Sequence, residues 1–220
     1  MLNLSAFVDF HARRHPGRLA LIYGHRRVSF GELQRDTTAL SALLSARGIG
    51  AQCVVALLMK NSAAFLEFAI AVSRLGAVLL PLNYRLAADE VTYIVGHADA
   101  SLVIADREFA GTVASLPGVL LLDDEAQRDP MRLVSQPFNA PSAVPRSEED
   151  LFRLMYTSGT TDRPKGVMHS YANFYWKSMA HVAALELSAN DRLLVVGPLY
   201  HVGAFDLPGL AVLWLGGAIC

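Results

Sequence analysis

The feature that most constrains this chain is a series of short apolar runs that alternate with segments of helical periodicity. The apolar runs are 53–59, 76–82, 101–106 and 119–123, and the helical patterns between them are 62–75 and 87–97, with a further short helix between 106 and 119. Apolar runs of this length, separated by helices, are typical of βαβ units in a parallel sheet. The sequence therefore predicts an α/β fold with layered, mainly parallel strands and helices on both sides of them.

Related patterns extend toward both ends of the chain. On the N-terminal side the predicted elements are a helix at 4–15, strands at 19–24 and 26–30, and a helix at 30–46. Ser29 and Glu32 have the spacing of a capping box, which supports a helix start at that point. On the C-terminal side the predicted elements are strands at 151–156 and 192–197, a helix at 170–187, and a last helix after 198–205. The run 216–220 is typical of a strand that is just beginning.

Residues 123–150 differ from the rest in being polar and repeatedly interrupted by proline. Their carboxylates could form a metal-binding cluster, or the segment could be a solvated connection on the surface. The composition favours the surface connection, because such stretches are typical of loops.

Composition excludes several classes of protein. Lys plus Arg number 19 and Asp plus Glu number 20, so the formal net charge is 19 − 20 = −1, which argues against a basic nucleic-acid-binding surface. With 53% hydrophobic residues the chain is too apolar to be disordered. Its two cysteines show no framework spacing, and no run has the length of a signal peptide core or a membrane span. These features predict a cytoplasmic protein.

The loop at 157–166 is the segment with the most chemistry. It combines hydroxyl side chains, two glycines and Lys165 directly after an apolar strand. Glycine lets backbone amides turn inward together, and the hydroxyls and the ammonium add donors, so the loop could hold a polyphosphate. The alternative is an ordinary turn with a solvated lysine. The phosphate loop of nucleotide hydrolases does not match, because Pro164 and Gly166 flank the lysine.

The complete string YTSGTTDRPKGV (156–167) resembles the signature loop of the adenylate-forming enzymes, YTSGTTGxPKGV. This superfamily comprises acyl-CoA synthetases, peptide-synthetase adenylation domains and luciferases of the firefly type. Further similar segments are GAVLLPLNYRL (76–86), PLYHVGAF (198–205) and the helix start FGEL (30–33). The resemblance extends over essentially all 220 residues and is strongest to bacterial acyl-CoA synthetases.

The resemblance implies that a carboxylic acid reacts with ATP to give an acyl-adenylate, which is then transferred to CoA, with Mg²⁺ sharing the neutralisation of charge. The residues implied to hold the β- and γ-phosphates are Thr157, Ser158, Gly159, Thr160, Thr161 and Lys165. Thr157 is also implied as a magnesium ligand. His201 is implied to be catalytic, at the wall between the nucleotide and acid pockets. Without the resemblance, His201 would be interpreted as a histidine of the core or of a turn, and His169 and His181 as surface or packing residues.

One residue departs from the family pattern, namely Asp162 in place of glycine. A carboxylate near phosphate would be repelled, so we expect Asp162 to point away from the phosphates. The resemblance also implies that residues 1–220 are the N-terminal part of the AMP-binding domain, with an incomplete fold and without the C-terminal domain. We therefore expect this chain alone to be inactive. An unpaired sheet edge would favour association, so a homo-oligomer is a further expectation.

Two other functions stay open at this stage. The chain could be a short protein that binds nucleotide without catalysis, although the strand beginning at 216–220 speaks against this. It could also belong to another adenylate-forming enzyme, such as a peptide-synthetase adenylation domain. Fatty, alicyclic and aromatic acids all remain candidate substrates, with fatty acid metabolism as one setting.

Overall fold

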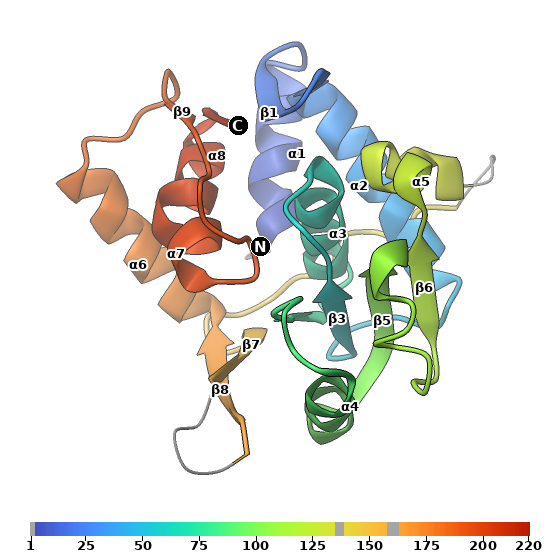
Figure 1. Cartoon of the computed structure of the whole chain (residues 1–220). Coiled ribbons are helices and arrows are strands. Elements are labelled where there is room, and N and C mark those ends of the chain that lie inside the picture. Colours follow the sequence, from blue (N-terminus) through green and yellow to red (C-terminus); the bar gives the residue numbers. More distant parts are fainter. Residues whose placement is uncertain (1–2, 135–138, 158–162) are drawn as a thin grey trace.

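The computed structural model describes residues 3–134, 139–157 and 163–220 (Figure 1). Helix α1 (Leu4–Arg14) is followed by the antiparallel strands β1 (Leu19–Tyr23) and β2 (Arg26–Ser29), and then by α2 (Phe30–Ser45). The backbone N–H of Ser29 donates to the Glu32 carboxylate at 2.8 Å, and the N–H of Glu32 donates to Ser29 Oγ at 3.3 Å. This capping box satisfies N–H groups that a helix start leaves unpaired, as the spacing predicted.

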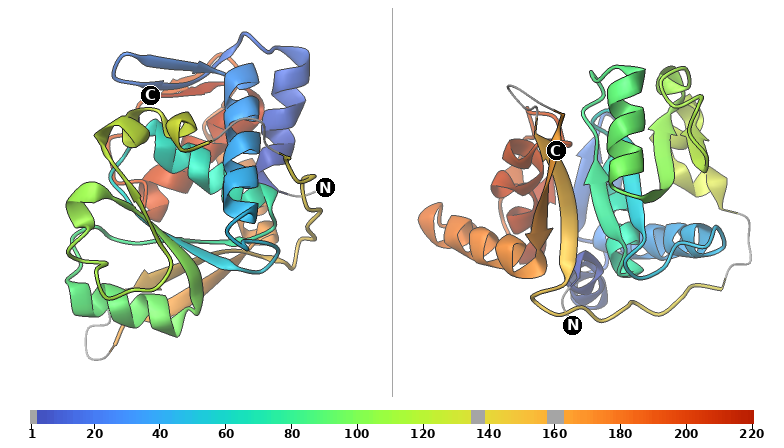
Figure 2. Two further views of the ribbon diagram at one scale, coloured as in Figure 1. Left: turned by 90° about the vertical axis from the view of Figure 1, so that its right-hand side faces the viewer. Right: turned by 90° about the horizontal axis from the view of Figure 1, so that it is seen from below.

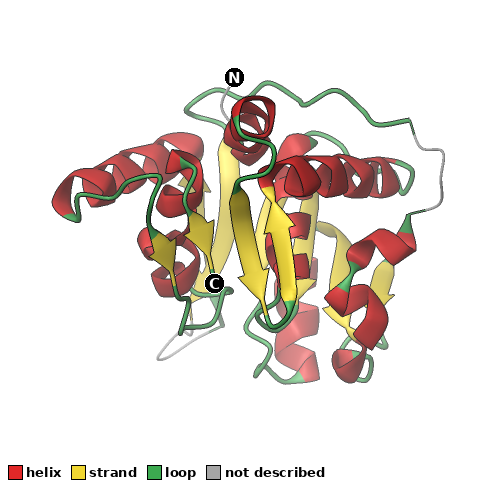
Figure 3. Ribbon diagram, turned by 90° about the horizontal axis from the view of Figure 1, so that it is seen from above, coloured by secondary structure: helices red, strands yellow, loops and turns green. Residues whose placement is uncertain are grey.

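The larger sheet has six strands in the order β6-β5-β3-β4-β7-β8. The bounds are β3 (Val54–Leu58), β4 (Val78–Pro81), β5 (Ala100–Asp106), β6 (Val119–Leu122), β7 (Leu151–Thr157) and β8 (Lys165–Ser170). The first five strands are parallel, and β8 is antiparallel to β7. Helices α3 (Ala63–Arg74) and α4 (Ala88–His97) connect the central strands. Helices lie on both sides of the strands (Figure 3). The predicted α/β fold with mainly parallel strands and flanking helices is confirmed.

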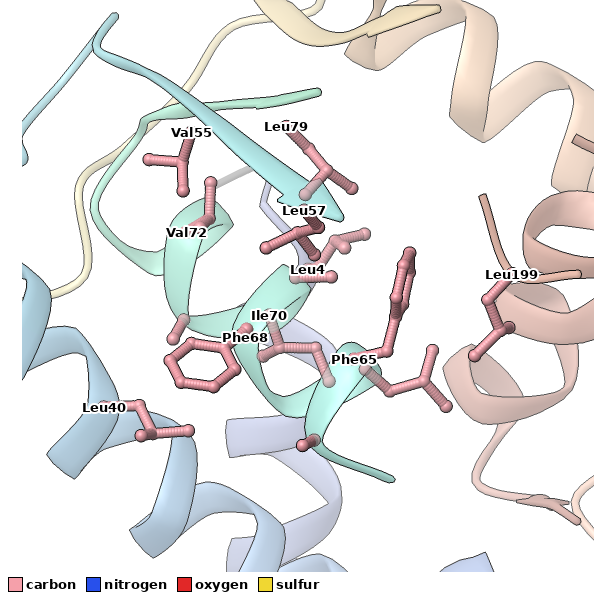
Figure 4. Close-up of a cluster of buried hydrophobic side chains, with 14 of the residues drawn as sticks. Leu4, Leu40, Val55, Leu57, Phe65, Phe68, Ile70, Val72, Leu79 and Leu199 are labelled. Atoms are coloured by element: carbon pink, nitrogen blue, oxygen red, sulfur yellow. The ribbon is translucent and has the colours of Figure 1, made fainter. Parts of the chain in front are cut away.

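The two faces of this sheet support two separate cores. Side chains of successive strand residues point to opposite faces, so neighbours along β3 enter different cores. Val55 and Leu57 pack on the side of α3, together with Leu79 of β4 (Figure 4). Ala56 and Leu58 pack on the other side, in the cluster that contains Ile94 of α4. Because both faces are covered, the strands are apolar throughout, which explains the uninterrupted runs in the sequence.

A smaller sheet joins the two ends of the chain, in the order β2-β1-β10-β9. Strands β9 (Arg192–Leu193) and β10 (Ala218–Ile219) have two residues each, and β10 lies parallel to β1 with Leu21 opposite Ile219 (Figure 2). Along the chain, α6 (Tyr171–Ala184) lies between β8 and β9. The short α7 (Val202–Phe205), a π-helical turn (Asp206–Leu210) and α8 (Ala211–Leu215) lie between β9 and β10.

Three local predictions are wrong. The strand expected at 192–197 ends at Leu193, and Val196 is 89% exposed. Residues 123–150 are not a continuous loop, because α5 (Asp124–Arg128) and a 3₁₀ turn (Pro130–Leu133) form there and bury Ala126 and Pro130. The short helix expected between 106 and 119 is a 3₁₀ turn (Arg107–Phe109). At 192–197 the apolar content predicted too long a strand, because the pairing with β10 ends at Leu193. At 123–150 the polar, proline-rich composition concealed a helical turn whose start is capped by Asp123.

Two absences apply to the residues that the structure describes. No three of their His, Cys, Asp or Glu side chains gather as a metal site, so the carboxylates in the described part of 123–150 form no such cluster. None of their helices combines the length and apolar character needed to cross a bilayer.

Candidate functional site

The signature loop lies at the tip of a β-hairpin. Strands β7 and β8 pair from Leu151 opposite Ser170 to Thr157 opposite Lys165, so Thr157 and Lys165 face each other where the hairpin opens into the loop. The elements predicted on either side of this loop, a strand at 151–156 and a helix at 170–187, placed it directly between a strand and a helix. That prediction is wrong, since β8 intervenes and α6 begins only after it. Residues 165–170 lack a clear apolar alternation, and their pairing with β7 is what makes them a strand.

Part of the predicted phosphate-binding set lies outside the described residues. These are Ser158, Gly159, Thr160 and Thr161, together with Asp162. The prediction that Asp162 points away from phosphate therefore stays a prediction. Thr157 and Lys165 are exposed at the ends of the two strands, as ligand-facing side chains must be before a ligand binds.

The loop end of the hairpin is held against α4. The Tyr156 hydroxyl and His97 Nδ1 form a hydrogen bond of 2.7 Å, and the Arg163 guanidinium lies over the Tyr93 ring at 5.1 Å from its centre. Burial raises the pKa of Tyr156, so its hydroxyl stays protonated at neutral pH. Gly166 permits this packing, because a Cβ there would lie 3.1 Å from Cζ of Tyr156. Sequence reasoning did not identify His97 as an anchor of the loop.

A cavity of about 580 Å³ lies beside this hairpin. Apolar side chains such as Leu82, Ile94 and Met155 line it, and Thr157 and His201 add polar groups. Lys165 lies outside its lining. The structure thus brings two of the predicted site residues, 44 positions apart in sequence, into one cavity. Mostly apolar walls with a few polar groups are usual for a small-molecule site.

His201 caps the start of α7. The backbone N–H of Gly203 donates to His201 Nδ1 at 3.1 Å. Since Nδ1 accepts this bond, a neutral His201 ring carries its proton on Nε2. The segment that leads to His201 is fixed by Asn61, whose amide donates to Gly197 O and accepts from Leu199 N, both at 2.7 Å. Asn61 lies three residues after the end of β3, and a polar residue just past a buried strand was the sequence signal that could have identified it.

His169 is a cavity residue that sequence reasoning left among surface and packing positions. It lies on β8 and lines the same cavity as Thr157. Nη2 of Arg153 donates to His169 Nδ1 at 2.8 Å, which leaves the proton of the neutral ring on Nε2. Burial, together with the nearby Arg153 charge, lowers the pKa of His169, so this ring is a neutral donor at pH 7.

Comparison with known proteins agrees with this architecture. The AMP-binding enzyme family model matches residues 8–220. The feruloyl-CoA synthase of Amycolatopsis is 34% identical over 208 residues, which cover 94% of this chain and 41% of that protein. ATP-bound MatB from Rhodopseudomonas palustris superposes with a TM-score of 0.86 at 25% identity, covering 99% of this chain and 45% of that one. The inhibitor-bound N-terminal domain of FACL13 from Mycobacterium tuberculosis has a TM-score of 0.85 at 28% identity, covering 100% and 57%.

The chain therefore belongs to the AMP-binding enzyme family. Its relatives include acyl-CoA ligases, and it spans about two fifths of the length of the curated relative described above. The resemblance inferred from the signature loop is confirmed at the level of the family.

Proposed function

We propose that this chain supplies the phosphate-binding hairpin and part of the acid pocket of an AMP-forming acid–CoA ligase, as the N-terminal part of its AMP-binding domain. The observation that carries the proposal is the hairpin end itself: Thr157 and Lys165 are paired across the strands, and Thr157 lines the cavity that also contains His201. A polyanion bound at this end would meet a hydroxyl and an ammonium before it reaches the apolar part of the cavity.

The chemistry suits the first half-reaction. A carboxylate must approach the α-phosphorus of ATP, so two negative groups are brought together and their charge must be neutralised. Lys165, with Ser158, Gly159, Thr160 and Thr161 of the loop, would hold the β- and γ-phosphates. Thr157 offers a hydroxyl oxygen, the ligand type that Mg²⁺ prefers, and bound Mg²⁺ would neutralise phosphate charge. His201, with its proton on Nε2, would donate a hydrogen bond between the nucleotide and the acid.

CoA is the acceptor that the relatives favour over a tethered thiol, because the feruloyl-CoA synthase is named for a CoA product. We do not expect the 220-residue chain to turn over substrate by itself, since it spans only part of such proteins. Binding of ATP without turnover is therefore the property to measure first.

The test is ATP affinity of the 220-residue chain by isothermal titration calorimetry, with Mg²⁺ present. Lys165→Met removes a charge-assisted contact of about 1.5–3 kcal/mol, so Kd should rise roughly ten- to hundred-fold. Lys60→Met is the matched control, because Lys60 is an exposed lysine paired with Glu108. Equal ATP affinity in both variants and the wild type would contradict the proposed role of the hairpin.

A further inference from the structure

A second cavity, of about 390 Å³, is lined by residues of the β7–β8 hairpin and of the helices α6 and α7. Val167, His169 and Val202 line both this cavity and the site cavity described above. The two spaces therefore meet at these three side chains. A substrate whose reacting group lies beside Thr157 and His201 could extend past them into the second cavity.

The second cavity contains a buried cluster of charges. Arg153 of β7 forms two hydrogen bonds with Asp206, Nη1 to Oδ1 at 2.8 Å and Nη2 to Oδ2 at 2.6 Å, and both side chains are almost fully buried. Lys177 of α6 adds a third, from Nζ to Asp206 Oδ2 at 2.6 Å. All three residues line the cavity. Two cations thus share one carboxylate.

The other groups around this cluster do not balance it. His169 is neutral, because its Nδ1 accepts from Arg153 and its pKa is lowered. Asn173 is uncharged and caps its own helix through a bond from the Ser170 N–H. Among the described residues that line this cavity, Asp206 is the one carboxylate. The cluster therefore carries a net charge of +1 at neutral pH.

Lys177 is the cation that the fold does not require. The two hydrogen bonds from Arg153 already give each oxygen of the Asp206 carboxylate a donor, and they link β7 to the turn after α7. The Lys177 side chain keeps 30% of its surface exposed, and burial lowers the pKa of its ammonium, as expected for a charge with too little compensation. Removing a cation from water costs free energy unless a counter-ion compensates it, and Lys177 must share Asp206 with Arg153. A cluster that served the fold alone would need only the Arg153–Asp206 pair.

We propose that the second cavity receives an anionic group at the far end of the acid substrate, and that Lys177 selects for it. The substrate class would then be dicarboxylic acids, with one carboxylate activated beside Thr157 and His201 and the other held by Lys177. This inference rests on the proposed function, since it takes the site cavity as the place where the reacting carboxylate binds. The aromatic rings of Phe152 and Phe205 lie 5.5 and 5.6 Å from the Arg153 guanidinium, so apolar surface adjoins the charges.

The chain offers a direct reporter for this proposal, because its only lysines are Lys60, Lys165 and Lys177. Lysine labelled with ¹³C at Cε should give three resonances in the intact 220-residue chain, assigned with the Lys→Met variant of each. The titrants are succinate, glutarate and adipate, each paired with the monocarboxylate of equal carbon number, namely butyrate, pentanoate and hexanoate. ATP with Mg²⁺ is titrated separately.

At least one dicarboxylate should move the Lys177 resonance, with a Kd ten-fold or more below that of its paired monocarboxylate. Lys60 should not move. Lys177→Met should abolish the ten-fold preference, measured by calorimetry, whereas Lys60→Met should retain it. Circular dichroism of the Lys177→Met variant should match the wild type, since the Arg153–Asp206 pair remains.

Each other result overturns the proposal. Equal affinities within every pair, or a Lys177 resonance that no dicarboxylate moves, would mean that this cavity does not select a second carboxylate. Inorganic phosphate moving Lys177 as strongly as the dicarboxylates do would mean a general anion site unrelated to the acid. Failure of the proposed function is seen separately, as a Lys165 resonance that does not respond to ATP.

Discussion

Two buried charge clusters in this molecule use the same ingredients in opposite proportions. In the first, Arg26 donates to both oxygens of Glu67, at 2.9 and 2.7 Å, and lies 3.4 Å from Asp36. In the second, Arg153 and Lys177 share Asp206. The first has one largely buried cation for two carboxylates, with the exposed Arg35 a further 3.5 Å from Asp36, and it lies outside the two cavities at the site. The second has two cations for one carboxylate and lines a cavity.

The difference in proportion has opposite effects on the acids. Burial raises the pKa of Glu67 to about 7 despite the bonds from Arg26, because the side chain is fully buried and Asp36 is a second negative charge nearby. Asp206 is also strongly buried, yet its two cations hold its pKa below the usual range. The comparison teaches that burial alone does not determine ionisation, because the neighbouring charges decide it. The surplus of cations beside Asp206 is the feature on which the proposed binding of a second carboxylate rests.

The largest effect should come from Asp206→Asn. This change leaves Arg153 buried without a counter-ion and removes the partner of the half-buried Lys177, so the free energy of unfolding should fall by about 3–5 kcal/mol, measured by urea denaturation at pH 7. Glu108→Gln, in the exposed pair with Lys60, is the control and should leave the urea midpoint unchanged. If the free energy of unfolding falls no more than in the control, the charge cluster at the cavity does not stabilise the fold.

Glu67→Gln should cost less, about 1–3 kcal/mol, because Arg26 keeps Asp36 as a partner. It should also change the pH dependence of stability. The folded-state pKa of Glu67 is raised from 4.5 to about 7, so its contribution is full below pH 4.5 and is lost as pH rises toward 7.

The wild-type protein should therefore lose stability between pH 4.5 and 7 more steeply than the Glu67→Gln variant, as measured by urea midpoints at each pH. Asp206 acts in the opposite direction, since a lowered pKa gives stability that is lost as pH falls below 3.8. Parallel curves for wild type and variant between pH 4.5 and 7 would show that Glu67 is ionised throughout and that the first cluster is balanced.

The smallest change is expected for Lys177→Met. If Lys177 is surplus to the fold, its removal should alter the free energy of unfolding by less than about 1 kcal/mol, because the Arg153–Asp206 pair remains. The urea midpoint of this variant is compared directly with that of Asp206→Asn. A loss as large as the one in Asp206→Asn would make Lys177 a structural counter-ion and remove the distinction between the two clusters.

The parts of the fold that local sequence could predict are those set by short-range periodicity. The runs around β3, β4 and β5 are apolar at every position because both faces of the sheet are covered, and the helix starts at Ser29 and Ser62 follow from their capping side chains. The strand β8 could not be predicted in this way. It exists because β7 supplies its hydrogen-bond partners, and Val167 and Met168 remain partly exposed on it.

The candidate site divides in the same way. The string at 156–167 identified the loop, and the segment at 198–205 identified His201, since both are continuous in sequence. His97, Asn61 and His169 were missed, because each acts through a partner far away along the chain. The packing of strands and helices determines these partners, and the spacing of residues along the chain does not identify them.

The sequence by itself determined the α/β class, the order of most elements, the family-specific loop and the absence of a strong net charge. These depend on local periodicity, capping and composition, which act over a few residues. The tertiary structure alone decided that β8 completes a hairpin, that Thr157 and His201 share a cavity, and that Arg153 and Lys177 meet Asp206 from 53 and 29 residues away. Charges so far apart in sequence become neighbours only when the register of the sheet and the position of α6 are fixed together.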